Sequence, residues 1–176
     1  KVLDSCGLYN VSIEHISGKL TDHYDPRSKV LRLSDSTYAS RSVAAVCVAA
    51  HECGHAVQHA TAYAPLRMRS ALVPVVQFSS SIVSWVLLAG IIMLQSFPQL
   101  LLIGICLFAM TTLFSFITLP VEIDASRRAL VWLSSAGITN AFNHQQATDA
   151  LKSAAYTYVV AALGSLAYAD LLRNDY

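Results

Sequence analysis

The sequence predicts a mainly α-helical integral membrane protein with a transmembrane helical hairpin and a small β-hairpin near its N-terminus. Residues 70–121 contain no Asp, Glu, Lys or Arg, whereas one bilayer crossing needs only about 20 apolar residues. Over the whole chain, 55% of residues are hydrophobic and 13% are charged, well below the roughly one quarter that is charged in an average soluble domain. Two consecutive membrane crossings are therefore expected.

The two crossings are expected near residues 71–94 and 100–119. Pro98 and the polar side chains around it interrupt the apolar run at residues 95–99, as a turn between two spans requires. The alternative is a pair of buried helices in a large soluble core. A chain of 176 residues supplies too little surrounding mass to bury two such helices, so we favour membrane spans.

Positive charges predict the orientation of this hairpin. Arg67 and Arg69 precede the first crossing, Arg127 and Arg128 follow the second, and the intervening turn carries no positive charge. Because cytosolic loops are enriched in Lys and Arg, both ends of the hairpin are expected on the cytosolic side. The four cysteines form no Cys-x-x-Cys pair and are expected to be free thiols.

The segment HECGH at residues 51–55 contains two imidazoles four positions apart. In a helix this spacing stacks His51 and His55 on one face, where both can bind a zinc ion. Glu52 lies about 100° around the helix from His51, so it can reach a metal-bound water without joining the ligand row. Cys53 lies about 200° from His51 and points away from the ion. This layout is typical of a zinc hydrolase.

The helix that carries this segment is expected to begin after Ser40 or Ser42, which are candidate N-cap residues. Residues 43–50 are small and apolar on every side, which predicts a helix packed closely among its neighbours. His59 lies about 12 Å along the helix from His51, too far to share one ion with it.

A third zinc ligand must come from outside this segment. The glycine-containing extension that supplies a third histidine in some zinc enzymes does not follow His55. Glu122 is the first charged residue after the second crossing, and the topology of the hairpin returns it to the side of His51. Glu122 is therefore the leading candidate for the third ligand.

The two ends of the chain are less strongly patterned. Alternating polar and apolar residues predict short strands near residues 10–14 and 29–33, with turns at Gly18 and at the Asp25-Pro26 pair. An edge strand before the metal-binding helix could bind an extended polypeptide, or it could only cover the helix. Residues 153–169 are uncharged and form either a third span or a helix packed against the others, because about 25 Å of helix is marginal for a crossing.

These elements divide the chain into three consecutive parts, which we expect to form one integrated catalytic unit. Residues 1–66 contain the cytosolic strand pair and the His-Glu-x-x-His helix. Residues 67–121 form the transmembrane hairpin. Residues 122–176 contain the helix with the third ligand, which is expected to end at Gly137, and the C-terminal helix.

Three segments occur together in this chain: GKLTDHYDP at residues 18–26, SVAAVCVAAHECGHAVQH at residues 42–59 and LPVEIDAS at residues 119–126. In combination they resemble the YugP-type membrane-bound neutral zinc metallopeptidases of bacteria, distant relatives of the HtpX-type membrane proteases. The resemblance covers nearly the whole chain, and the combination is specific where HExxH alone is not.

The resemblance implies a gluzincin-like site in which His51, His55 and Glu122 bind one Zn²⁺ per chain and Glu52 is the catalytic base. It implies a membrane-embedded zinc metalloendopeptidase of the bacterial cytoplasmic membrane that hydrolyses peptide bonds with a zinc-activated water. The substrate would be a polypeptide, such as a membrane protein or a misfolded protein, and we expect the active site to face the cytosol. Family members usually begin with a further transmembrane segment, which we expect before Lys1.

One position departs from the HtpX-type relatives, which have an aspartate that supports the site four residues after the glutamate ligand. The residue at that position is Ser126, and Asp124 lies about 200° around a helix from Glu122. Asp124 could support the site in place of that aspartate. A salt bridge with Arg127 or Arg128 is an equally good account of Asp124.

A different class of function is a non-catalytic zinc-binding membrane protein with a structural, sensing or transport role. A structural zinc usually has four protein ligands, so a fourth protein ligand would favour this alternative. In an enzyme, the candidate donors to the oxyanion are Tyr156, Tyr158, His144 and Arg127. The formal charge of +1, without an extended basic patch or a glycine-rich phosphate loop, argues against nucleic-acid and nucleotide partners.

Overall fold

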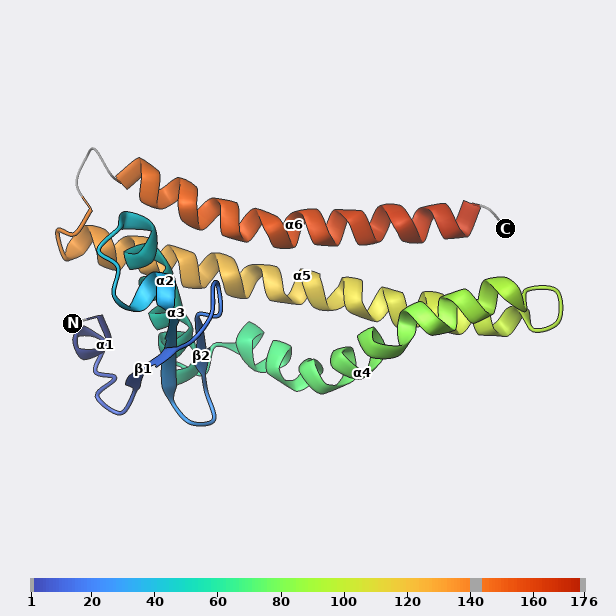
Figure 1. The fold of residues 1–176 in the computed structure, drawn as a ribbon, viewed down its shortest axis with the longest axis horizontal. Helices are drawn as coiled ribbons and strands as arrows, with labels where there is room; N and C mark the ends of the chain where they lie inside the picture. The colour runs from blue at the N-terminus through green and yellow to red at the C-terminus, as the bar shows by residue number, and fades with distance from the viewer. Residues whose placement is uncertain (1, 140–143, 175–176) are drawn as a thin grey trace. The chain divides into compact units, whose positions relative to one another are not determined.

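The computed structural model describes residues 2–139 and 144–174, and at several positions between residues 154 and 174 it describes the helical backbone alone. In chain order, the elements of the described residues are α1 (Val2–Ser5), β1 (Ser12–Ile16), β2 (His23–Asp25), β3 (Val30–Ser34), α2 (Asp35–Tyr38), α3 (Val43–Ala60), α4 (Ala64–Ile92), α5 (Pro98–Ser135) and α6 (His144–Asn174) (Figure 1). The predicted fold class is confirmed: the chain is mainly helical, with a small N-terminal sheet and two long apolar helices.

The chain forms two compact units. The first comprises Lys1–Leu66 and Val121–Ala155, and the second comprises Arg67–Pro120 and Tyr156–Tyr176. Helices α5 and α6 each contribute residues to both units. The four residues predicted to form the metal site all belong to the first unit, so their geometry can be described within a single body.

The N-terminal sheet differs from the predicted strand pair in its topology. Its strand order is β1-β3-β2, with β1 parallel to β3 and β2 antiparallel to β3. The strands predicted at residues 10–14 and 29–33 are both present, shifted by one or two residues, but they lie parallel and do not form a hairpin. The hairpin consists of β2 and β3.

The cause of this difference is the additional strand β2, whose three residues are too few to show an alternating pattern. The chain turns before β2 at Gly18, where a φ of 121° favours glycine. A tight turn then joins β2 to β3, and in it the Asp25 carboxylate accepts hydrogen bonds from the Arg27 amide at 2.9 Å and the Ser28 hydroxyl at 2.6 Å. The predicted turn at Asp25 is present, but it connects a different pair of strands.

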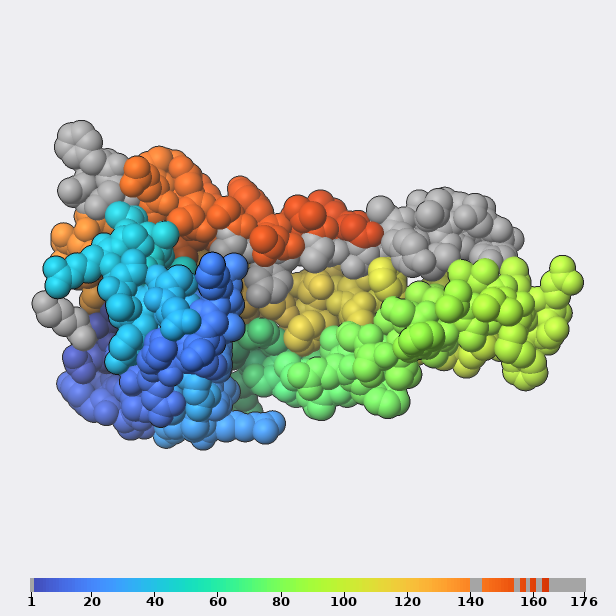
Figure 2. Space-filling model, viewed as in Figure 1, coloured from blue at the N-terminus to red at the C-terminus, as the bar shows by residue number. Residues whose placement is uncertain are grey.

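Strand β3 is the buried centre of the sheet. Leu31 and Leu33 pack with Cys53 and Ala56 of α3 and with Leu3 of α1. Because β3 is hydrogen-bonded on both sides, it cannot be the edge strand next to the metal-binding helix. Strand β2 has that position, since it lies at the sheet edge and contacts α3. In Figure 2 the atoms of the N-terminal residues, coloured blue, gather in one mass at the left.

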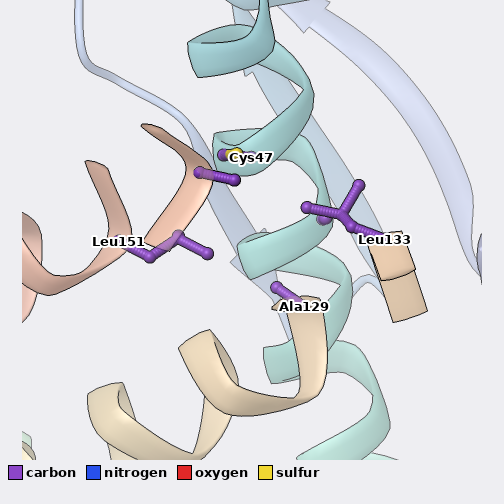
Figure 3. Packing of buried hydrophobic residues seen from close by; sticks show 6 residues of the cluster. Cys47, Ala129, Leu133 and Leu151 are labelled. Carbon is purple, nitrogen blue, oxygen red and sulfur yellow. The ribbon is translucent and has the colours of Figure 1, made fainter. Parts of the chain in front are cut away.

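Helix α3 begins at one of the two predicted N-caps. The Oγ atom of Ser42 accepts a hydrogen bond from the Ala45 amide at 3.2 Å. Further along, small side chains of α3 pack into a cluster with α5 and α6, and Figure 3 shows side chains from three helices converging there. The buried members of this cluster are Cys47, Ala50, Ala129, Leu133, Ala147 and Leu151.

Helices α3 and α5 come into backbone contact at Gly54. A Cβ atom at this position would lie 2.7 Å from the carbonyl oxygen of Ala125 and 3.1 Å from its Cα. A Cβ atom cannot approach backbone atoms this closely without a shift of the helices, so glycine permits the observed spacing. Ala125 is itself fully buried, and the contact therefore has small residues on both sides.

Helices α4 and α5 are long and apolar enough to cross a membrane. Their most apolar 18-residue windows have mean hydropathies of 1.9 and 2.5, and only 17% of each window is buried within the protein. The turn between the helices overlaps the predicted break at residues 95–99. Within the second unit, the two helices pack through glycines: a Cβ on Gly90 would lie 2.7 Å from Leu101, and a Cβ on Gly104 would lie 2.7 Å from Leu87.

Helix α5 extends beyond the predicted second span. It continues through Pro120 to Ser135 as one helix, where a span ending at residue 119 and a separate helix were expected. Gly137, with a φ of 66°, follows its end as predicted. The third span considered for residues 153–169 falls mostly on side chains outside the described part of the chain, and it stays a prediction.

Replacing Gly54 tests the contact between α3 and α5. We expect Gly54→Ala to lower the free energy of unfolding by about 1–3 kcal/mol, because the added methyl group overpacks a buried contact. Thermal unfolding of the detergent-solubilised protein measures this loss. The matched control is Gly164→Ala, where a Cβ meets nothing within 4 Å and alanine is the better helix former. An unchanged melting temperature for Gly54→Ala would contradict the close approach.

Candidate metal centre

The two imidazoles of α3 lie on one side of the helix. The ring centroids of His51 and His55 are 4.7 Å apart, and the rings meet edge to face. Their side chains are only 13% and 11% exposed, so both are largely shielded from water. The spacing of four residues thus produces the shared face that the sequence predicts.

Glu122 of α5 lies next to both imidazoles. Its Oε2 atom is 3.1 Å from His51 Nε2 and 3.6 Å from His55 Nε2. In a tetrahedral zinc site with bonds of about 2.0–2.1 Å, neighbouring ligand atoms are separated by roughly 3.3 Å. The two distances from Glu122 therefore match the spacing of atoms that share a zinc ion.

Glu52 is a second carboxylate beside the imidazoles. Potential ligand atoms of His51, Glu52 and His55 all lie within 4.8 Å of one another. The Glu52 Oε2 atom accepts a hydrogen bond from the backbone amide of Tyr24 in β2 at 3.1 Å. Burial raises the pKa of Glu52 above its ordinary value, although the two histidines oppose the rise. The site thus contains two buried carboxylates with different partners.

The second nitrogen of each imidazole also has a partner. His51 Nδ1 lies 3.1 Å from Ser126 Oγ, and His55 Nδ1 lies 3.0 Å from Gln58 Oε1. Partners of this kind orient a ligating imidazole and determine which nitrogen carries the proton. With Nδ1 engaged in this way, both Nε2 atoms are directed to Glu122.

Sequence reasoning did not identify Gln58 and treated Ser126 only as a departure from a family pattern. Both follow a proposed ligand by one helical turn: Gln58 comes three residues after His55, and Ser126 comes four residues after Glu122. Residues at these separations share a helix face. A polar residue one turn after a ligand is the signal that could have found them.

Asp124 has both of the roles between which the sequence did not decide. Its Oδ2 atom accepts a hydrogen bond from Gln58 Nε2 at 2.8 Å and pairs with Arg128 Nε at 2.6 Å. It therefore forms the expected salt bridge and at the same time contacts the site through Gln58. It does not touch either histidine in the way that Ser126 does.

Cys53 and His59 lie outside the group of potential ligand atoms. Cys53 packs with Leu31 and Ala56, and burial raises the pKa of its thiol to about 12. The His59 Nδ1 atom is 3.0 Å from the Tyr24 hydroxyl. That neither side chain binds the metal stays a prediction.

Of the four candidate oxyanion donors, two have described side chains in the first unit, Arg127 and His144. Arg127 lies about 140° around α5 from Glu122. The His144 Nδ1 atom lies 3.2 Å from Ser134 Oγ. Ser134 is about 18 Å along α5 from Glu122. Tyr156 belongs to the second unit, and the side chain of Tyr158 lies outside the described residues. The geometry therefore supports neither Arg127 nor His144 as the donor.

The family described as "putative neutral zinc metallopeptidase" matches residues 1–173. The chain belongs to this family. A relative from Bacillus subtilis (strain 168), named "Putative membrane protease YugP", is 44% identical to this metallopeptidase over 173 residues, which cover 98% of the chain and 75% of the relative. No solved structure matches the chain.

The family membership makes this chain a hydrolase of polypeptides with zinc as its metal. The residues present fit that ion, since two imidazoles and a carboxylate are ligands that catalytic zinc sites use, with a fourth position left open. The name of the relative, a membrane protease, agrees with the two candidate spans α4 and α5.

Removing the charge of Glu122 tests its contact with the metal. We expect Glu122→Gln to bind zinc more weakly by a factor greater than the roughly 10–100-fold that is lost when a hydrogen-bond partner of a ligand is removed. Elemental analysis of the detergent-purified protein after dialysis against a chelator measures zinc per chain. Glu14→Gln, an exposed site on β1, is the control and should retain its zinc. Full zinc content in Glu122→Gln would exclude Glu122 from the ligands.

Proposed function

We propose that His51, His55 and Glu122 bind one zinc ion per chain and that Glu52 is the general base of a metalloendopeptidase. The observation that carries this proposal is the different placement of the two carboxylates. Glu122 Oε2 is 3.1 and 3.6 Å from the two Nε2 atoms, whereas Glu52 Oε2 is bonded to the amide of Tyr24. A ligand must share the ion with the imidazoles, and a base must lie beside it.

The proposed chemistry assigns a separate task to Glu52. When bound, zinc supplies a Lewis acid that lowers the pKa of a water molecule and polarises the carbonyl group of the scissile peptide. Glu52 takes a proton from the attacking water onto a carboxylate oxygen and returns it to the nitrogen of the leaving amine. The hydrogen bond from Tyr24 holds Oε2 in place and leaves Oε1 available for the proton. The products are a carboxylate and an amine.

Strand β2 is the proposed binding edge for the substrate. Tyr24 is opposite Leu31 in the register of β2 and β3, and its amide donates to Glu52. The outer edge of β2 is therefore adjacent to the proposed base. An extended polypeptide that pairs with this edge would lie beside Glu52. If β2 only covers α3, the substrate does not need to be extended in order to bind.

A non-catalytic zinc site is the second candidate. The observation in its favour is that Glu52 belongs to the same group of atoms within 4.8 Å as His51 and His55. Glu52 could thus act as a fourth protein ligand together with Glu122. Four protein ligands leave no position for water and are typical of a structural zinc.

The proposed location is the bacterial cytoplasmic membrane, with the first unit in the cytosol. Basic residues at both ends of the α4–α5 hairpin support this orientation, because positive charge is enriched on the cytosolic side. They are Arg67, Arg69, Arg127 and Arg128. The substrates of this metallopeptidase would then be polypeptides accessible from the cytosol, such as misfolded proteins or the cytosolic parts of membrane proteins.

Replacing Glu52 tests whether this residue is the general base or a zinc ligand. We expect Glu52→Gln to retain zinc and to cleave a denatured, fluorescently labelled casein at least about 100-fold more slowly, because a general base typically contributes 10²–10⁴-fold. Cleavage is measured in detergent at matched zinc content, with Glu14→Gln as the fully active control. Loss of zinc from Glu52→Gln would favour the four-ligand site, and undiminished cleavage would reject Glu52 as the base.

Cysteine labelling tests the orientation. Cys6 is exposed in the first unit, and Cys106 is exposed on the apolar part of α5. In inverted vesicles, a membrane-impermeant maleimide should label Cys6, while Cys106 is protected by lipid. In right-side-out vesicles neither cysteine should react. The variant Cys6→Ser should remove the labelling seen in inverted vesicles. Labelling of Cys6 in intact right-side-out vesicles would contradict the cytosolic location.

A further inference from the structure

Gln58 is a fully buried amide that connects three parts of the metal centre. Its Oε1 atom lies 3.0 Å from His55 Nδ1. Its Nε2 atom donates to the Val121 carbonyl at 2.8 Å and to Asp124 Oδ2, also at 2.8 Å. Every polar atom of this side chain therefore has a partner inside the first unit.

We propose that Gln58 is a positioning residue that fixes the tautomer of His55 for zinc binding. The inference rests on the proposed function, because it takes His55 as a zinc ligand. It adds a residue that touches neither the metal nor the substrate but controls a ligand that does. The groups around the amide that can donate a proton determine this tautomer.

The orientation of the Gln58 amide is determined by its neighbours. A backbone carbonyl can only accept a hydrogen bond, and the same holds for a carboxylate paired with an arginine. The amide nitrogen, with its two hydrogens, must therefore face Val121 and Asp124. A flipped amide would place an oxygen against two acceptor oxygens in a buried site, and each unmade hydrogen bond there is costly.

This orientation leaves Oε1 facing His55, and it determines where the imidazole proton lies. An amide oxygen only accepts, so His55 Nδ1 must donate. In the neutral imidazole, Nε2 then has the free lone pair, and Nε2 is the atom directed to Glu122. Gln58 thus keeps a proton on His55 Nδ1 and leaves Nε2 as the atom that can bind the metal.

The Asp124–Arg128 pair holds the amide without adding charge to the site. Arg128 Nε is 2.6 Å from Asp124 Oδ2, and the guanidinium group also lies over the ring of Tyr63, 5.9 Å from its centroid. Since the charge of Arg128 balances that of Asp124, this pair orients the Gln58 amide, and through it the His55 imidazole, without adding net charge beside the metal centre. The sequence of contacts from Arg128 to Asp124, Gln58 and His55 is therefore a positioning relay.

His51 has a different kind of partner. A serine hydroxyl both donates and accepts, so Ser126, at 3.1 Å from His51 Nδ1, is compatible with either tautomer. Of the two Nδ1 atoms, only that of His55 faces a partner that can only accept. Changes at Gln58 should consequently affect zinc binding more than the change Ser126→Ala.

Two variants distinguish the role of Gln58 Oε1, which accepts from His55, from the role of Nε2, which donates to Val121 and Asp124. Gln58→Met has a similar length but no hydrogen bonds, and we expect it to bind zinc roughly 10–100-fold more weakly. Gln58→Glu keeps an acceptor for His55 but loses both donors, so it should be less stable while retaining zinc affinity close to that of the wild type. Competition with a chromophoric zinc chelator measures affinity in detergent, and thermal unfolding of the metal-free protein measures stability.

Gln145→Met is the matched control, because Gln145 also donates to an aspartate, Asp149, at 2.9 Å, but has no histidine partner among the described residues. It should leave zinc affinity unchanged. A merely structural role for Gln58 would make the Met and Glu variants lose stability alike, with no affinity difference between them, and that result would overturn the proposal. If both variants fail to fold, Asp124→Ala, which removes the side-chain acceptor of Gln58 Nε2, should still weaken zinc binding; unchanged affinity in that variant would overturn the proposal.

Glu122→Gln in the same assay distinguishes failure of this inference from failure of the proposed function. If Glu122→Gln loses zinc and Gln58→Met retains wild-type affinity, the ligand set stands and the relay is rejected. If Gln58→Met loses affinity and Gln58→Glu restores it while Glu122→Gln binds normally, the relay stands and the third ligand must be reassigned.

Discussion

The backbone contact between α3 and α5 at Gly54 places the parts of the metal centre next to one another. With no side chain at Gly54, the two helices meet at Ala125. Glu122 lies almost one turn before Ala125 on α5, and the contact thereby holds its carboxylate beside His51 and His55. The HECGH segment alone supplies two proposed ligands and a carboxylate. The third ligand that we propose depends on how closely these helices pack.

That packing buries a dense set of polar groups, and a buried polar group is stable only when it has a partner. The imidazoles meet this requirement through Ser126 and Gln58, while Glu52 is held by the amide of β2. The small sheet and the end of α5 therefore do more than cover the helix that carries the histidines. They fix the direction in which each side chain points before an ion or a substrate binds.

Features that depend on local periodicity or spacing could be predicted from the sequence: the apolar helices, the Ser42 cap, the shared face of His51 and His55, and the return of Glu122 by the hairpin. The role of Gln58 could not, because it depends on which carbonyl and which carboxylate α5 presents to α3. The strand order of the sheet could not either, since β2 has three residues and its position is set by packing against α3. Tertiary contacts, and not propensities, decided both.

The most direct test of this account is the position of zinc in the intact protein, located by anomalous scattering at the zinc absorption edge from crystals grown in detergent or lipid. The account predicts one zinc ion per chain, bonded to Nε2 of His51 and His55 and to the Glu122 carboxylate, with the Glu52 carboxylate nearby but not bonded. An ion bonded to Glu52 in place of Glu122, or to both carboxylates with no open position, would contradict it.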